Sequence, residues 1–241
     1  MTGIVASPLK SPLNVSFAST PLISKTQYYN LTASNGQTLV NRINRNGVGT
    51  IATLASPQAA VYMDTASDLM ALVTNQGFKV YQDTGTPSLM SSSVPNLLGV
   101  QQLAAADLNQ DGTSDILAWA DITRGVSPPA LHILLHQDNG SFKEETALAT
   151  ALNNRLSGLG QILGMTTGDF DGDGMADLLV ATTNNVQWLP LDGSLNPTIL
   201  TNVAAVGLKS MQAADLDSDG LADLAVVTSS GFTLYLNTAL R

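Results

Sequence analysis

The sequence predicts an all-β protein, a β-propeller built from four-stranded blades. A carboxylate-rich phrase, D-x-[DN]-x-D-G-x-x-D, occurs three times, and an apolar, strand-like run follows each copy. The copies begin at Asp107, Asp169 and Asp215, and a degenerate upstream copy sets a period of about 46 residues. Periods of roughly 40 to 50 residues with several short strands each are typical of propeller blades. About five such units fit into the 241 residues.

Composition limits the class of protein. With 44% hydrophobic and 12% charged residues, the chain can bury a sizeable core, so we expect a single folded domain over residues 1–241. The absence of cysteine excludes disulfides, a thiol nucleophile and Cys-based metal sites. No apolar stretch reaches the roughly 20 residues that span a bilayer. The first ten residues also lack the basic and apolar regions of a signal peptide.

The negative charge is concentrated in the three repeated phrases. The net charge is -9, and the three loops hold 11 of the 19 acidic residues. Without these 11 acids the basic residues would be in excess, so the acidity is local. A negative balance of this size also argues against binding nucleic acid through its phosphates.

The first 57 residues are expected to form a divergent first blade without a metal loop. Its strand-like segments are residues 14–19, 26–33, 37–43 and 49–56. The chain ends only three strands into its last unit, so that unit lacks an outer strand. Residues 3–7 or 14–19 are apolar enough to supply this strand and to close a ring.

The second unit, which opens the repeats over residues 58–241, has kept its strands and lost its metal loop. The segment DLMALVTNQGFKVYQ (68–82) aligns with DLAVVTSSGFTLYLN (223–237). In this alignment Ala60 and Tyr62 occupy the first two ligand positions, and neither side chain offers a carboxylate. We therefore expect no ion beside Asp64.

The third and fourth units follow the same strand pattern, with extra residues in the third. The strands expected in the fourth unit are Ile162 to Gly168, Ala176 to Thr183, Val186 to Leu191 and Leu195 to Thr201. The third unit is about 15 residues longer, and we expect an insertion near residues 120–130. Residues 144–156 could form a helix or an excursion on the surface.

Each repeated phrase has the ligand spacing of a calcium loop between the first and second strands of a blade. Calcium takes six to eight oxygen ligands, and alternate residues of a tight loop can direct oxygens to one centre. All-oxygen donors favour calcium over zinc or copper. We therefore predict about three Ca²⁺ ions, held by side chains at loop positions 1, 3, 5 and 9 and by the carbonyl of position 7. These residues are Asp107, Asn109, Asp111, Thr113 and Asp115; Asp169, Asp171, Asp173, Met175 and Asp177; and Asp215, Asp217, Asp219, Leu221 and Asp223.

Two other structures could use a similar phrase. An EF-hand needs a bidentate Glu at position 12 and flanking helices, but position 12 is Ala118, Val180 or Val226, inside an apolar strand-like run. Asp-Gly hairpin turns without metal are the simpler alternative. Three copies with an acid or amide at every ligand position favour calcium.

Other candidate sites are weaker. His132 and His136 lie four residues apart on a predicted strand and could form half of a metal site, although polar positions on a half-exposed strand are the ordinary interpretation. Trp119 and Trp188 are interpreted as packing residues, with a sugar-binding platform as the alternative.

The three loops and their strands resemble the FG-GAP and VCBS-type repeats of integrin α-subunit propellers and of many bacterial surface and secreted proteins. "NGSF" (139–142) and the Gly-Phe pairs at residues 77 and 231 fit this resemblance, which covers about residues 58–241. It implies a calcium-binding β-propeller that is extracytoplasmic and is used for binding rather than catalysis. The family commonly has about seven blades, more than this chain can supply, and the Gly-Ala-Pro part of its signature is missing.

Three classes of function follow. The favoured one is a non-enzymatic, calcium-stabilised module that docks another protein or belongs to a larger extracytoplasmic assembly. The second is a glycan-binding or adhesion module, which would need exposed aromatic side chains. The third is a hydrolase or lyase on a propeller scaffold, which would need a catalytic pair that the sequence does not identify.

Overall fold

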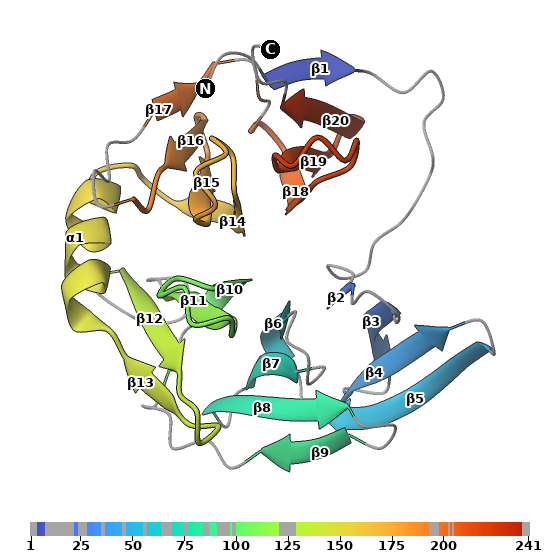
Figure 1. Ribbon diagram of the computed structural model, residues 1–241. Coiled ribbons are helices and arrows are strands. Elements are labelled where there is room, and N and C mark those ends of the chain that lie inside the picture. Colours follow the sequence, from blue (N-terminus) through green and yellow to red (C-terminus); the bar gives the residue numbers. More distant parts are fainter. Residues whose placement is uncertain are drawn as a thin grey trace. The chain divides into compact units, whose positions relative to one another are not determined.

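The structure is a computed structural model, and it confirms an all-β chain with little helix. It describes the backbone of the strands between residues 4 and 90, and the backbone and side chains of residues 97, 100–120, 129–192, 198–201, 203 and 205–237. The described strands form five four-stranded antiparallel sheets (Figure 1). The chain divides into two compact units, which are described separately.

One unit comprises Ser16–Ala105 and Asp111–Ala149 and contains three sheets. In each of them strands that follow one another in sequence are neighbours. The first sheet is β2 (Leu22–Ile23), β3 (Tyr28–Ser34), β4 (Gln37–Asn44) and β5 (Gly47–Leu54). The second is β6 (Pro57–Met63), β7 (Leu69–Thr74), β8 (Gly77–Asp83) and β9 (Pro87–Met90). The third is β10 (Val100–Ala106), β11 (Asp115–Ala120), β12 (Ala130–His136) and β13 (Phe142–Glu144).

The other unit comprises Met1–Val15, Ala106–Gln110 and Thr150–Arg241 and contains two sheets. One is β14 (Ile162–Gly168), β15 (Asp177–Thr182), β16 (Val186–Leu189) and β17 (Thr198–Leu200). The other has the order β1-β20-β19-β18, with β18 (Leu208–Ala214), β19 (Asp223–Thr228), β20 (Gly231–Asn237) and β1 (Ile4–Ser7). The strands predicted for the fourth unit therefore correspond to β14–β17, with ends that differ by up to three residues.

The outer strand of the last sheet comes from the opposite end of the sequence. β1 pairs antiparallel with β20, in a register that places Ile4 opposite Asn237 and Ser7 opposite Leu234 (Figure 1). Residues 3–7 were one of the two segments expected to fill this place. The other segment, 14–19, lies outside the described residues, as does the degenerate loop at 64–68.

The helix candidate at 144–156 forms α1, Thr146–Leu156. The Glu145 carboxylate accepts hydrogen bonds from the amides of Ala147 (2.9 Å) and Leu148 (3.5 Å), which are two of the unpaired donors at a helix N-terminus. Gly158, just after the helix, has φ +86°, a conformation that suits glycine at a helix C-terminus. Within the described residues, no helix is long and apolar enough to cross a membrane.

The extra length of the third repeat is not confined to residues 120–130. The connection from β13 to β14, residues 145–161, contains α1, whereas residues 201–207 are sufficient to join β17 to β18. The connection from β11 to β12, residues 121–129, is also longer than its counterpart at 183–185. The predicted single insertion is therefore wrong: the additional residues are divided between two connections, and the larger part contains the helix.

The two sheets that contain β14–β17 and β18–β20 share one apolar core. Phe170, Leu179, Leu224 and Tyr235 are each at most 3% exposed and belong to this cluster. The side-chain hydroxyl of Thr166 on β14 also accepts a hydrogen bond from the amide of Ala213 on β18 (3.0 Å). Burial of this apolar surface holds the strands that position two of the repeated acidic loops.

Candidate metal centre

The three repeated phrases form loops between neighbouring strands, as predicted. The first acidic loop (residues 107–115) joins β10 to β11, the second (169–177) joins β14 to β15, and the third (215–223) joins β18 to β19. In each, the ninth residue is also the first residue of the following strand. The described elements on both sides of each loop are strands, which contradicts an EF-hand.

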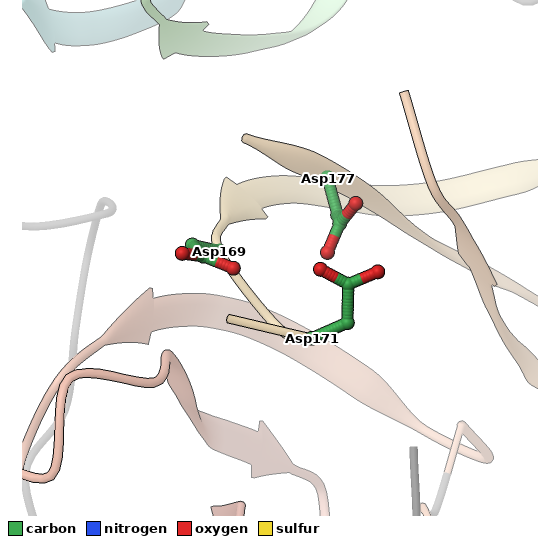
Figure 2. A group of neighbouring side chains, drawn as sticks. All are labelled: Asp169, Asp171 and Asp177. Carbon is green, nitrogen blue, oxygen red and sulfur yellow. The ribbon is translucent and has the colours of Figure 1, made fainter. Parts of the chain in front are cut away.

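Three carboxylates meet in the second acidic loop. One oxygen of each of Asp169, Asp171 and Asp177 lies within 4.8 Å of the others. Figure 2 shows the carboxylates of Asp171 and Asp177 facing each other, with Asp169 beside them. Asp177 is 1% exposed, whereas Asp171 is exposed, so the group extends from the core to the surface.

Hydrogen bonds from backbone amides hold the exposed part of this loop in place. Asp169 accepts hydrogen bonds from the amides of Gly172 (2.7 Å) and Gly174 (3.0 Å), and Asp173 accepts one from Met175 (2.7 Å). Gly172 and Gly174 have φ values of +83° and +81°, a left-handed conformation that glycine adopts without steric cost. The loop is therefore a tight turn that brings alternate side chains to one side.

The third acidic loop repeats this geometry. One oxygen of each of Asp215, Asp217 and Asp223 lies within 4.8 Å of the others. The amide of Gly220 donates to Asp215 (3.2 Å), and the amide of Leu221 donates to Asp219 (2.9 Å). Asp223 is fully buried, as the equivalent residue of the second loop is.

The electrostatics of the second loop favour a bound cation. Asp177 Oδ2 accepts a hydrogen bond from the amide of Phe170 (2.9 Å). Burial raises the pKa of Asp177 from 3.8 to about 6, and interactions with the Phe170 amide, the Trp188 side chain and the Leu191 amide only partly oppose this shift. Burial, together with the charges of Asp173 and Asp169, also raises the pKa of Asp171. A cation placed between these two carboxylates would favour their ionised forms.

These residues fit a calcium ion. The donor set consists of carboxylate oxygens, which are the ligands that calcium prefers. The three carboxylate oxygens that lie within 4.8 Å of one another are acceptors that a single cation would satisfy. A divalent ion would also remove the repulsion among the three carboxylates.

The boundary between the two compact units falls within the first acidic loop, so each part of this loop is described by itself. Asp107 and Asn109 belong to one unit, and Asp111, Thr113 and Asp115 belong to the other. The amide of Thr113 donates to Asp111 Oδ1 (2.8 Å), and Asp115, which is buried, accepts the amide of His136 (2.8 Å). Assembly of an ion site at Asp107 stays a prediction.

The structure brings together six of the predicted side-chain ligands, three in each of two loops. Asp173 and Asp219 lie outside these groups, and the complete ligand sets, including the carbonyls of Met175 and Leu221, stay predictions.

Two features were not predicted. The fourth loop position has a left-handed backbone conformation even where it is not glycine, with φ +60° at Gln110 and +63° at Ser218. The glycine at this position in the second loop, Gly172, was the sequence feature that could have predicted this conformation. The second feature is Asn237, which contacts both loops.

The weaker candidates have ordinary structural roles. His132 Nδ1 lies 2.8 Å from Glu144 Oε1 across the β12–β13 pair, and the ring of His136 stacks on Phe142 with 4.9 Å between centroids. Burial lowers the pKa of His136, although Asp111 and Asp138 oppose the shift. Trp119 is 5% exposed and Trp188 packs against the apolar core, so the prediction of packing residues is confirmed.

Comparison with known proteins identifies the repeats. Residues 107–180 and residues 169–226 each match the FG-GAP-like repeat family. A search of curated proteins gives no match. Two solved structures are similar at low sequence identity. A protein of unknown function from Bacteroides caccae is 15% identical over 90% of this chain and 72% of that chain, with a TM-score of 0.46. The N-terminal domain of Nup159 is 14% identical over 89% of this chain and 63% of that chain, with a TM-score of 0.48.

Proposed function

The chain is an FG-GAP-type repeat protein, and we propose that it is a non-enzymatic, calcium-stabilised β-propeller that serves as a protein–protein interaction or structural module. The observation that carries this proposal is the group of three carboxylates, Asp169, Asp171 and Asp177, whose oxygens lie within 4.8 Å of one another inside one of the family repeats. Carboxylates this close repel one another unless a cation lies between them. FG-GAP repeats often bind calcium, which is the ligand that these oxygens suit.

Calcium would act here as part of the fold. Each ion would be bound by the side chains at positions 1, 3, 5 and 9 of an acidic loop and by one backbone carbonyl. The side chains are carboxylates, except for Asn109 at position 3 of the first loop, and the carbonyls are those of Thr113, Met175 and Leu221. Because only the folded loop gathers these oxygens, binding would stabilise the folded state by mass action. The first loop, with Asn109 in place of a carboxylate, would bind its ion most weakly.

The propeller assignment is supported by the repeating sheets. Five described sheets have four strands each, and the sheets of the three matched repeats carry their acidic loop between equivalent strands. The pairing of β1 with β20 supports a ring that is closed by the N-terminal strand, since free sheet edges have to be paired or covered. About five blades within a single domain over residues 1–241 is the resulting proposal.

The interaction role is supported by the family. FG-GAP repeats generally mediate protein interactions and are typically extracellular and non-enzymatic. We therefore propose a partner protein or larger assembly outside the cytoplasm. A glycan-binding role has less support, because the exposed large hydrophobic side chains among the described residues are aliphatic: Ile199, Val206 and Leu216. No observation on the described residues favours a hydrolase or lyase over these two.

Thermal unfolding tests the calcium proposal. EDTA should lower the Tm of the full chain, added calcium should restore it, and elemental analysis should find calcium bound. Asp171→Asn combined with Asp177→Asn should reduce the calcium-dependent part of the Tm. The matched control is Asp138→Asn, which changes an exposed acid outside the acidic loops and should leave that part unchanged. Equal Tm values in EDTA and calcium, without bound calcium, would contradict the proposal.

Affinity purification tests the interaction role. The tagged full chain should retain a partner protein from its native source in calcium and release it in EDTA, because the module loses its stabilising ions. Mass spectrometry identifies what is retained, and Asp171→Asn/Asp177→Asn serves as the calcium-weakened comparison. Retention of a polysaccharide and no protein would favour the glycan-binding alternative instead.

A further inference from the structure

The second and third acidic loops are joined by a continuous series of buried hydrogen bonds. The side-chain amide of Asn237 donates to the carbonyl of Phe170 in the second loop (2.7 Å), and its backbone amide donates to Asp223 Oδ1 in the third (2.8 Å). The amide of Phe170 in turn donates to Asp177 Oδ2 (2.9 Å). Asn237 therefore links the buried ninth-position carboxylates of both loops through three hydrogen bonds.

A second contact joins the same loops through their backbones. The amide of Ala222 in the third loop donates to the carbonyl of Asp169 in the second loop (2.6 Å). The packing there is close: a Cβ placed on Gly168 would lie 2.6 Å from the Cβ of Ala222, and one on Gly172 would lie 3.0 Å from Leu221. Gly168 leads into the second loop, and Gly172 lies within it. The two loops are therefore in direct backbone contact and closely packed.

From these contacts we infer that the two loops bind their ions cooperatively and that Asn237 is the positioning residue that couples them. The inference rests on the calcium binding proposed above. An ion in the second loop would fix the chain at Asp169 and Phe170, whose carbonyls are the acceptors for Ala222 and Asn237. The third loop would then be ordered before it binds its own ion, so that binding step would lose less conformational entropy.

Electrostatics between the loops opposes this coupling, and salt should reduce that opposition. Each loop carries four aspartates, and the charge of an ion in one loop reduces the attraction of the other for a second cation. The carboxylates that face water, Asp171 and Asp217 among them, are exposed, and salt screens such charges beyond about 8 Å at physiological ionic strength. The hydrogen bonds through Asn237 are buried, since Asn237 is 2% exposed, and salt does not weaken them in this way.

A calcium titration followed by NMR can observe each loop separately. The amides of Gly174 and Gly220 lie in the second and third loops and donate to Asp169 and Asp215. Disabling the third loop with Asp217→Asn/Asp219→Asn should weaken calcium binding at Gly174 by about 5-fold or more. Disabling the second loop with Asp171→Asn/Asp173→Asn should weaken binding at Gly220 by the same factor, because coupling is reciprocal.

Variants of Asn237 test its role. Asn237→Leu has a similar shape without the amide, and it should reduce the coupling to less than about 2-fold; Asn237→Ser gives the same test if the leucine variant does not fold. The matched control is Thr166→Val, which removes another hydrogen bond between the two sheets, at a site outside the loops. It should lower the Tm and leave the coupling intact.

Four results would overturn the inference. If each loop binds with unchanged affinity when the other is disabled, the loops are independent, although the calcium proposal stands. If Asn237→Leu retains the coupling, another contact carries it. If the effect of disabling one loop disappears in about 0.5 M salt, it comes from the carboxylate charges that the disabling substitutions remove, and not from Asn237. If neither glycine responds to calcium in the unaltered chain, the calcium proposal itself has failed.

Discussion

The second and third acidic loops have the same nine-residue pattern, but their buried ninth residues are satisfied differently. Both oxygens of Asp223 accept backbone hydrogen bonds, from the amides of Leu216 and Asn237 (2.8 Å each). Asp177 accepts one such bond of normal geometry, from Phe170 (2.9 Å), and the Trp188 side chain and the Leu191 amide act on it as well. The repeated pattern therefore determines where the carboxylate lies, and the strand beyond the loop determines how well the protein completes its hydrogen bonding.

The difference originates at the end of the third strand of each sheet. In the sequence alignment of these repeats, Asn237 corresponds to Leu191. Asn237 is the last residue of β20, whereas β16 ends at Leu189, before Pro190. Proline has no amide hydrogen and restricts the backbone, so it ends the strand at this point. The Leu191 amide still interacts with Asp177, but Oδ1 lacks a hydrogen bond of the geometry that the Asn237 amide gives Asp223.

The largest expected effect comes from removing the strand that completes the third loop's sheet. Deletion of residues 1–7 removes β1, whose Ile4 pairs with Asn237. At about 1 kcal/mol for each of the four paired residues, the free energy of unfolding should fall by about 4 kcal/mol. Calcium affinity should fall more at Gly220 than at Gly174, because β14–β17 are contiguous in sequence. Urea unfolding and the NMR titration measure these effects.

An intact, monomeric truncated chain with unchanged stability would contradict that expectation and the closing role proposed for β1. The control is a change in the same strand that leaves its backbone pairing in place, Ile4→Val, which should have a much smaller effect. Aggregation of the deletion variant would agree with an exposed β20 edge.

The second largest effect is expected from alanine at the ninth position, which should destabilise the second and third loops by different amounts. In EDTA, Asp223→Ala leaves the amides of Leu216 and Asn237 without acceptors, at a cost of about 3 kcal/mol. Asp177→Ala leaves the amide of Phe170 without an acceptor and removes the weaker interactions with Trp188 and Leu191, so it should cost less, about 1–2 kcal/mol. Urea unfolding of both variants in EDTA measures the difference. Equal losses would show that the two carboxylates have equivalent environments.

The sequence predicts the parts of this comparison that depend on local pattern. The spacing of the carboxylates and the apolar runs after them indicated the three loops and the strands β11, β15 and β19, because ligands and alternating side chains are encoded by neighbouring residues. Asn237 was missed because its partner Phe170 lies 67 residues away. The sequence also treats Phe170 and Leu216 alike as apolar second positions, although one is 1% exposed and the other 49% exposed. Their burial depends on which sheet covers them.

The pH dependence of the calcium-free protein should be sensitive to Asp177. Between pH 3.8 and about 6 the unfolded chain has released this proton and the folded chain retains it. The free energy of unfolding should therefore decrease as pH rises through this interval, and the full penalty is present above it. Asp177→Asn, which mimics the protonated group, should lack this decrease when compared with the unaltered chain in EDTA. Saturating calcium should abolish it as well, since the ion compensates the ionised carboxylate.

The smallest expected effect concerns the fourth loop position, where the second loop has Gly172 and the third has Ser218. Both are left-handed, with φ values of +83° and +63°, and this conformation costs a non-glycine residue roughly 1–2 kcal/mol. Ser218→Gly removes that cost but increases the entropy of the unfolded chain, so it should raise the free energy of unfolding by less than about 1 kcal/mol. Gly172→Ser should lower it by about 1–2 kcal/mol, because the new Cβ is strained and also lies 3.0 Å from Leu221. Urea unfolding in EDTA measures both substitutions without the contribution of calcium. Changes of the same sign would show that the fourth positions of the two loops are not equivalent.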